Sequence, residues 1–468
     1  MRPLLAGGDE EASFFSNICH VQVHRRTRAV RRLADHTRSG TLSNAVLSQI
    51  FLPLLSQPIF NSGVVDHLLV NECISTTGVI ASQLNWGSYN GLVLQYQRAI
   101  KHPKEKVPVK PLVRTLVSIL DNFHFPMEAI AERELPEEEV HDDEDDDEAD
   151  VETGTVPHQL KADSKIMDAV TAKLLPSLLR ILEARDETED VLRIPVCIGI
   201  VRITLHLPVA ERRPQVSRLL TIVAQIFRSK SQDTRNLARD TLCRIVVMLG
   251  PESLPEAMKQ LRGALLRGPH LHILAFVTHA LLVHISSHVD AGESFTDLDG
   301  SVADVVHVAA EVVFGESGKD VQAEGFTTKL KEVKGSASRG LDCFSLAAKG
   351  VSPAKLSTLL LPIRKITEET ESAKVMSLVD EVLRRVASGL NANPRLSPAE
   401  LLLICHTLIG QNAKFLKQTQ TPTEKAANVH PDIEVKVKRS REQQKDHYSN
   451  NSHRSVDLFC FVLDLARG

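Results

Sequence analysis

Apolar residues recur at steps of three and four residues through most of the chain, which is the period of an amphipathic helix. The pattern is clearest at 216–266, where an apolar series at 216–227 and a second at 237–249 are separated by a polar break. Gly250-Pro251 ends the second series, because glycine suits the C-terminus of a helix and proline cannot continue it. Helices joined by such short breaks must pack antiparallel on their neighbours.

The same pattern predicts further helical units at 42–60, 64–84, 108–125, 164–184, 191–207, 353–371, 373–390 and 398–416. Four prolines inside these units are expected to kink or divide them: Pro53, Pro176, Pro195 and Pro362. Such helix pairs cannot bury their apolar faces alone and must stack on one another. We therefore predict an all-α fold, an α-solenoid of HEAT-like helix pairs; one large irregular helical bundle is the alternative.

Three segments do not fit this pattern and set the domain boundaries. The first is an acidic segment at 132–163, which we predict to be a disordered insertion between helical repeats at 1–131 and 164–417. The second, at 315–340, is predicted to be a weak helix flanked by loops. The third, at 418–455, is polar throughout and is predicted to be a linker. It leads to an isolated terminal helix at 456–468, from which we expect the array to be truncated.

Composition supports a helical body that carries an unevenly distributed charge. A hydrophobic content of 43 % excludes a wholly disordered chain, and an aromatic content of only 4 % favours helices over a β-sandwich. The net charge is −4, but fourteen acidic residues and one arginine give 132–152 alone a charge of −13, which leaves +9 for the rest. A mildly basic body permits an RNA or other polyanionic partner without requiring one.

The seven cysteines lie more than 40 residues apart, so no Cys-x-x-Cys pair exists and we expect buried free thiols in a reducing compartment. The N-terminus has no apolar core typical of a signal peptide. The most apolar stretch, at 271–285, is short and interrupted by histidines, so no membrane span is predicted.

No common catalytic or cofactor motif is present in the sequence. The phosphate-binding glycine loops, the G-x-S-x-G elbow and the H-E-x-x-H helix are all missing. His284 and His288 have the i, i+4 spacing of a metal pair but lack a third ligand of fixed geometry. The acidic run at 142–148 lacks the turn glycine of a calcium loop. We therefore predict a non-enzymatic protein without cofactor or metal.

The most informative motif is HRRTRAVRRL at 24–33. On a helix, the four arginines Arg25, Arg28, Arg31 and Arg32 fall within one arc of about 120°. Ala29, Val30 and Leu33 occupy the opposite side. Their planar guanidinium groups suit phosphates or carboxylates, so we predict a contact with nucleic acid or an acidic partner; a solvated helix face is the alternative. Arg26 points into the apolar side and is expected to make a structural bond between stacked helices.

A second basic cluster lies in the polar linker and consists of Lys436, Lys438, Arg439 and Arg441. Short basic clusters in disordered chain serve as nuclear import signals or RNA contacts, and this one is a possible import signal.

Several segments together resemble the DRIM (Down-Regulated In Metastasis) family, also called the Utp-twenty family. They are FFSNI at 14–18, HRRTRAVRRL at 24–33, RIP at 193–195, RGPHLHILAFVTH at 267–279 and LPIRKI at 361–366. The resemblance covers about 14–416, whereas the part beyond 418 departs from the family. The pair at 216–249 also resembles a HEAT repeat, with Arg235 and Ala238 in the expected positions of the second helix but without the usual aspartate.

The resemblance implies a HEAT-repeat scaffold of the small-subunit processome, which assembles on nascent ribosomal RNA in the nucleolus. Family members are several times longer, so it also implies an internal portion. The expected function is support of 18S ribosomal RNA processing and small ribosomal subunit assembly. The expected partners are pre-ribosomal RNA and other processome proteins, with no membrane and no small-molecule substrate, and the expected location is the nucleus and nucleolus. A HEAT-repeat cargo or regulatory adaptor of the importin or phosphatase-scaffold type is the alternative.

Overall fold

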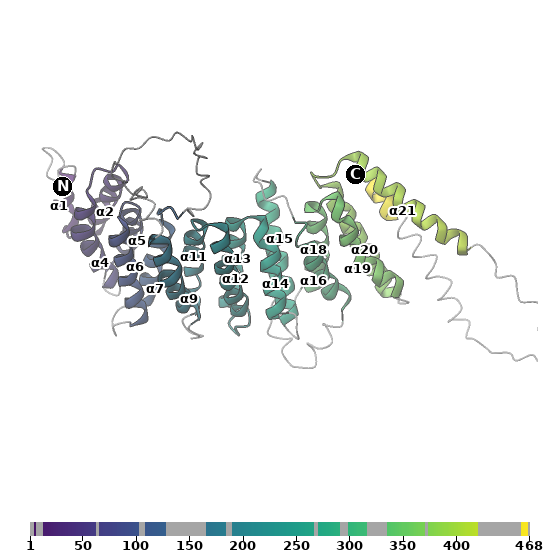
Figure 1. The fold of residues 1–468 in the computed structure, drawn as a ribbon, viewed down its shortest axis with the longest axis horizontal. Coiled ribbons are helices and arrows are strands. Elements are labelled where there is room, and N and C mark those ends of the chain that lie inside the picture. Colours follow the sequence, from purple (N-terminus) through teal and green to yellow (C-terminus); the bar gives the residue numbers. More distant parts are fainter. Residues whose placement is uncertain are drawn as a thin grey trace, which may run out of the picture. The chain divides into compact units, whose positions relative to one another are not determined.

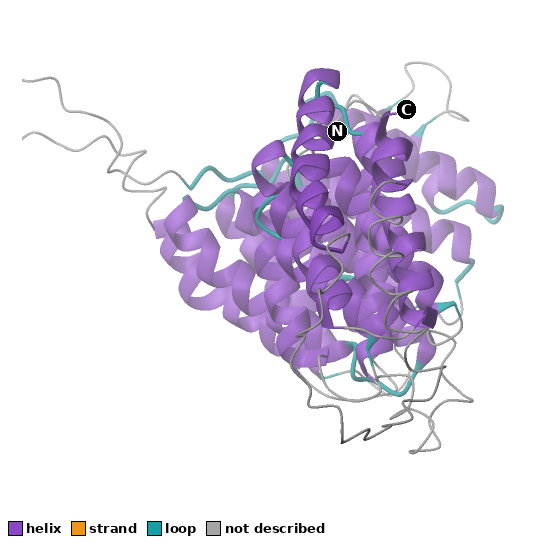
Figure 2. Cartoon of the chain, turned by 90° about the vertical axis from the view of Figure 1, so that its right-hand side faces the viewer, coloured by secondary structure: helices purple, strands orange, loops and turns teal. Residues whose placement is uncertain are grey.

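The computed structural model describes residues 4–5, 13–61, 65–102, 108–127, 165–183, 190–265, 270–290, 298–315, 335–369, 373–419 and 460–466. Within these ranges the regular structure is helical and contains no strand (Figure 2). The chain divides into two units, Met1–Ile245 and Val246–Gly468, which are described separately. The acidic insertion, most of the polar linker and the second basic cluster lie outside the described residues.

Unit 1 consists of two layers of helices (Figure 1). It begins with α1 (Phe14–Ile18). A short helix, α3 (Asn44–Val46), comes before α4 (Leu52–Phe60) along the chain. One layer contains, side by side, α2 (Val23–Arg38), α5 (His67–Ala81), α7 (Val109–Asp121) and α11 (Val196–Leu205). The other contains α4 (Leu52–Phe60), α6 (Trp86–Lys101), α9 (Leu175–Glu183) and α12 (Val209–Ile226). The unit ends within α13 (Gln232–Leu249).

Unit 2 repeats this two-layered arrangement. One layer contains α15 (His270–Asp290), α18 (Ser336–Gly350) and α20 (Ala373–Asn391). The other contains α14 (Leu254–Leu265), α16 (Val302–Phe314) and α19 (Leu356–Glu369), and α21 (Pro398–Thr419) follows. Successive hairpins contact one another in sequence order in each unit, so the prediction of an all-α solenoid of helix pairs is confirmed and the irregular bundle is not supported.

Polar contacts between neighbouring hairpins join residues at a nearly constant separation along the chain. In unit 1, Arg31 bonds Glu72 at a separation of 41 residues and Arg114 bonds Asn71 at 43. In unit 2, Arg385 bonds Asp342 at 43 residues and the Asn393 side chain donates to Ala348 O at 45. A structural period of about 40–47 residues is that of HEAT and armadillo repeats. The two units therefore share the repeat geometry although their sequences show no obvious repeat.

Glycines allow neighbouring helices of unit 1 to approach closely. A Cβ atom on Gly78 of α5 would lie 2.8 Å from the backbone oxygen of Ser118 on α7. A Cβ atom on Gly199 of α11 would lie 2.6 Å from the Cβ atom of Leu120, also on α7. Neither neighbouring atom can rotate away, so any larger residue at these positions must push two helices apart.

Three of the four prolines act at helix boundaries, and the fourth does not. Pro53 and Pro176 each lie one residue inside a helix that follows a π-helical turn, at Leu47–Phe51 and Val170–Leu174 respectively. A π turn relieves the missing i→i−4 hydrogen bond by shifting the register of the carbonyl groups. Pro195 divides α10 (Asp190–Arg193) from α11, as predicted. Pro362 lies inside α19, which continues through it.

Two arginines donate hydrogen bonds to backbone carbonyl groups in the connections between helices. Arg235 of α13 is only 4 % exposed, and its Nη1 donates to the carbonyl oxygens of Ser229 at 2.9 Å and Lys230 at 3.0 Å. Arg212 of α12 likewise donates to the oxygens of Leu205 and Leu207, both at 2.9 Å. These carbonyl groups lie at or beyond helix C-termini, where no intrahelical donor is available.

Helix ends and polar turns also follow the sequence signals. α13 ends at Leu249, and Gly250 takes a left-handed φ of +85° before Pro251 begins the 3₁₀ turn Pro251–Ser253. A second 3₁₀ turn, Pro353–Lys355, opens α19. The predicted stop at Gly250-Pro251 is therefore confirmed.

The helices α6, α15 and α16 and most of α18 lie outside the predicted units, and the expectation about the terminal helix was wrong. α6 was not predicted, because Gly87, Gly91 and several polar residues lower its helix propensity; tertiary packing of Tyr89, which is buried and donates to Ile119 O at 3.0 Å, stabilises it instead. The terminal helix, seen at 460–466, is not isolated. Its Phe461 is only 2 % exposed, and Asn391 of α20 donates to Asp464 O at 3.1 Å.

The cysteines of the described residues are free thiols that differ in exposure. Cys73, Cys197 and Cys343 are buried, and burial raises the pKa of each thiol to about 12. Cys19 is exposed, between α1 and α2. The expectation of buried free thiols therefore holds for most of the cysteines, with Cys19 as the exposed exception.

We expect Gly78→Ala to destabilise the chain by about 1–3 kcal/mol, because it separates α5 from α7. The matched control is Gly91→Ala on α6, where a Cβ atom would meet nothing within 4 Å. This control should stabilise by up to about 1 kcal/mol through helix propensity. Urea unfolding midpoints measure both changes, and equal shifts for the two variants would contradict the close approach.

We expect Arg235→Leu to lower the free energy of unfolding by about 2–4 kcal/mol, because buried carbonyl groups lose a charged donor. Arg228→Leu, at an exposed site, should change it by less than about 0.5 kcal/mol. Urea unfolding followed by circular dichroism compares the two, and a loss shared by both variants would show that Arg235 has no special role.

Candidate nucleic-acid interface

The predicted arginine patch lies on α2, whose apolar side packs into unit 1 as expected. Ala29, Val30 and Leu33 are buried against the unit. Arg28 and Arg31 are exposed, whereas Arg25 and Arg32 are partly buried. The structure therefore places the patch on the opposite side of the helix from the core, but it does not leave its members equally accessible.

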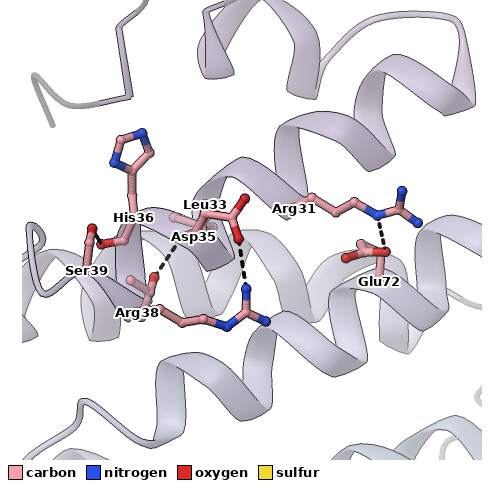
Figure 3. A network of polar contacts seen from close by, with 8 residues as sticks. Arg31, Leu33, Asp35, His36, Arg38, Ser39 and Glu72 are labelled. Carbon is pink, nitrogen blue, oxygen red and sulfur yellow. Dashed lines mark hydrogen bonds and ion pairs between the residues drawn. The ribbon is translucent and has the colours of Figure 1, made fainter.

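Arg31 forms an ion pair with a residue of the neighbouring helix α5. Its Nε lies 2.8 Å from Oε2 of Glu72 on α5, and the Arg31 side chain remains 67 % exposed (Figure 3). An ion pair with that exposure contributes at most about 1 kcal/mol to stability. The pair fixes the direction of the guanidinium group while its Nη atoms remain available to a ligand. Arg28 makes no ion pair among the described residues.

The C-terminal end of α2 carries a separate and self-contained polar group. Arg38 pairs with Asp35 one turn earlier at 2.8 Å, and Ser39 donates to the carbonyl oxygen of His36 at 3.0 Å (Figure 3). Because the Arg38 charge is neutralised within its own helix, the positive surface of α2 is concentrated between Arg25 and Arg32.

Arg26 does not make the expected bond between helices. Its Nε is buried and has no hydrogen-bond partner among the described residues. The guanidinium group lies near Cys73 of α5, where it opposes part of the rise that burial causes in the pKa of that thiol. Arg26 therefore contacts the neighbouring helix through packing and charge, not through a directed hydrogen bond at Nε.

Helices α7, α11 and α13 carry basic residues that the sequence analysis missed. Arg114 of α7 donates to Oδ1 of Asn71 on α5 at 2.7 Å, and Arg202 of α11 and Arg244 of α13 are exposed. Partial burial raises the pKa of the Asp121 carboxyl on α7, and the guanidinium groups of Arg202 and Arg244 oppose this rise. These arginines lie on three different helices, so only the packing of the helices relates them.

The described residues contain no group of three or more metal-ligating side chains. The rings of His284 and His288 on α15 contact each other edge to face, with centroids 4.9 Å apart. His279 on the same helix lies 3.7 Å from Asp342 of α18, and burial lowers the pKa of this histidine against the opposing effect of the aspartate. The absence of a cofactor or metal remains a prediction.

One described helix, α15, is long and apolar enough over His270–His288 to cross a membrane by length and composition alone. More than half of that segment is buried inside unit 2, where α15 contacts α14, α16 and α18. A buried core helix of a folded array can have the same length and apolar composition, and the burial of α15 is typical of such a helix.

Comparison with known proteins relates the whole array to one family. Residues 183–409 match the sequence model of the U3 small nucleolar RNA-associated protein 20 domain. U3 small nucleolar RNA-associated protein 20 of Schizosaccharomyces pombe is 30 % identical over 408 residues, which cover 87 % of this chain, and that of Saccharomyces cerevisiae is 28 % identical over 427 residues, 91 % of the chain. The chain thus carries the domain of the U3 small nucleolar RNA-associated protein 20 family and resembles that family over most of its length. The resemblance seen in the sequence is thereby confirmed.

The match to these U3 small nucleolar RNA-associated proteins covers only 16 % of either curated relative, so the chain corresponds to a small part of their length. Among solved structures, an engineered protein shows 14 % identity over 96 % of this chain and 88 % of its own, with a TM-score of 0.29. A chain from the Kap95p–RanGDP structure shows 12 % identity over 86 % and 49 %, with a TM-score of 0.32. Neither structural likeness is strong enough to bear on function.

We expect Arg31→Ala to lower the free energy of unfolding by less than about 1 kcal/mol, because its ion pair with Glu72 is largely exposed. The same substitution at Arg28 should leave stability unchanged. Guanidinium chloride would screen this pair, so urea unfolding at low ionic strength is the suitable measurement. A loss above about 2 kcal/mol for Arg31→Ala would show that this arginine is mainly structural.

Proposed function

We propose that this chain is part of a non-enzymatic scaffold of the small-subunit processome, which supports 18S ribosomal RNA processing and assembly of the small ribosomal subunit. The observation that supports this proposal is the similarity to two curated proteins named for their association with U3 small nucleolar RNA, which extends over about nine tenths of the chain. The proposed location is the nucleolus.

The architecture supports binding rather than catalysis. Stacked hairpins expose long rows of side chains on rigid elements, and such surfaces bind extended partners through many weak contacts. In the proposed scaffold, Arg25, Arg28, Arg31 and Arg32 contact pre-ribosomal RNA or an acidic segment of another processome protein. Arg28 and Arg31 are the members of this patch with the most accessible side chains.

The proposal predicts that the tagged chain, expressed in eukaryotic cells and crosslinked by ultraviolet light, recovers pre-ribosomal RNA and processome proteins from nucleoli. Replacement of Arg25, Arg28, Arg31 and Arg32 by glutamate should reduce the recovered RNA, because phosphates are then repelled. The matched control reverses Arg98, Arg180, Arg213 and Arg218 on α6, α9 and α12, and it should retain RNA.

Sequencing of the crosslinked RNA and mass spectrometry of the captured proteins give the result. A chain that stays outside nucleoli and captures transport or phosphatase subunits would replace the scaffold by the adaptor alternative. Equal loss of RNA in the control would instead show that the contact depends on total charge and not on the α2 patch.

A further inference from the structure

We infer that exposed arginines from four helices of unit 1 form one row that binds the phosphate backbone of RNA without reading its sequence. The row, here called the arginine row, consists of Arg28, Arg31, Arg114, Arg202 and Arg244. It rests on the proposed function in that both require RNA as a partner, but it assigns the contact to residues beyond the α2 patch.

Three of the four helices of the row, α2, α7 and α11, lie in one layer, and Arg244 of α13 is related to them by its interaction with Asp121 of α7. α2 contacts α5, α5 contacts α7, and α7 contacts α11, so their exposed faces adjoin within one layer (Figure 1). On α7, Lys110, Arg114 and Asp121 are separated by four and seven residues and therefore lie on one face. At an interaxial distance of 8–10 Å, the layer from α2 to α11 measures about 25–30 Å across.

α5 supplies the side chains that hold two of these arginines in place. It contributes no lysine or arginine of its own. Its Glu72 binds Nε of Arg31 at 2.8 Å on one side, and its Asn71 accepts a hydrogen bond from Arg114 at 2.7 Å on the other. Fixing a guanidinium group before the ligand arrives reduces the conformational entropy that binding removes.

Positive charge also gathers at the far end of the layer. Arg202 and Arg244 both act on the Asp121 carboxylate of α7. Near the end of α11, the pKa of His206 is lowered, first by burial and then by the positive groups of His124, Arg202 and Arg212. Arg202, Arg212 and His124 therefore lie close together near the end of α11. Basic groups gathered in this way attract an anionic polymer.

Chemistry favours an RNA backbone over an acidic peptide. The arginines are distributed over successive helices and not clustered on one, so the ligand must offer negative charge repeatedly over a distance of tens of ångströms. Every nucleotide of RNA carries such a charge, and the guanidinium fork binds phosphate oxygens in pairs. None of α2, α5, α7, α11 and α13 contains phenylalanine, tyrosine or tryptophan. Without an aromatic platform for base stacking, the row contacts backbone only.

The test uses the purified 468-residue chain and two fluorescent single-stranded RNAs of equal length, a uridine homopolymer and a mixed sequence. Fluorescence anisotropy at several salt concentrations gives Kd and its salt dependence. Each phosphate contact with a single strand contributes about 0.7 to the slope of log Kd against log salt. The triple variant Arg114→Gln, Arg202→Gln, Arg244→Gln should therefore lower the slope by about 2 and weaken binding at least about tenfold.

Two matched variants keep the inference falsifiable. Arg180→Gln, Arg213→Gln and Arg218→Gln remove the same charge from the other layer and should change the slope by less than about 0.7. Lysine at positions 114, 202 and 244 keeps the charge and should retain most of the slope. Unchanged unfolding midpoints for all three variants exclude a loss of folding as the cause.

Several results would overturn the row. They are an equal effect of the two glutamine triples, a tenfold difference in Kd between the two RNAs, and tighter binding of polyglutamate than of RNA at equal charge. If the chain still enters nucleoli and recovers processome proteins while the glutamine triple at 114, 202 and 244 binds RNA normally, the proposed function stands and the row alone is wrong.

Discussion

The burial of each hairpin's apolar face by the next hairpin is the interaction on which this structure depends. In a repeat array, a single helix pair cannot bury its apolar face alone and depends on its neighbours for that burial. At Gly78 and Gly199 the neighbouring helices approach until only a hydrogen atom fits between them. This close approach restricts how the hairpins of unit 1 can shift against one another. Hydrogen bonds between hairpins at separations of 41–45 residues are present in both units.

A fixed register between hairpins turns isolated surface residues into ordered rows. Arg114 and Arg31 are far apart in sequence, yet one helix, α5, contacts both through adjacent residues. A surface of this kind does not require a pocket, since its affinity comes from the sum of weak contacts on a rigid support.

Local periodicity predicted most of the fold and part of the candidate interface. The apolar side of α2 and the stop at Gly250 were predictable, because each depends on residues within a few turns of one helix. α6 was not, because its stability comes from Tyr89 and other side chains that pack against α7 and not from helix propensity. The sequence did not predict that Glu72 is the partner of Arg31. It did not predict the positions of Arg202 and Arg244 either. They depend on which helices become neighbours, and one sequence does not reveal that.

The contrast between buried and exposed thiols has a practical consequence for studies of the intact chain. Only the thiolate form of cysteine reacts readily with maleimides, and a pKa of about 12 leaves roughly one thiol in a hundred thousand ionised at neutral pH. Cys19 is exposed and lies only a few residues before α2. Once the partly buried Cys460 is replaced, a fluorophore attached to Cys19 would report from beside the guanidinium groups of α2.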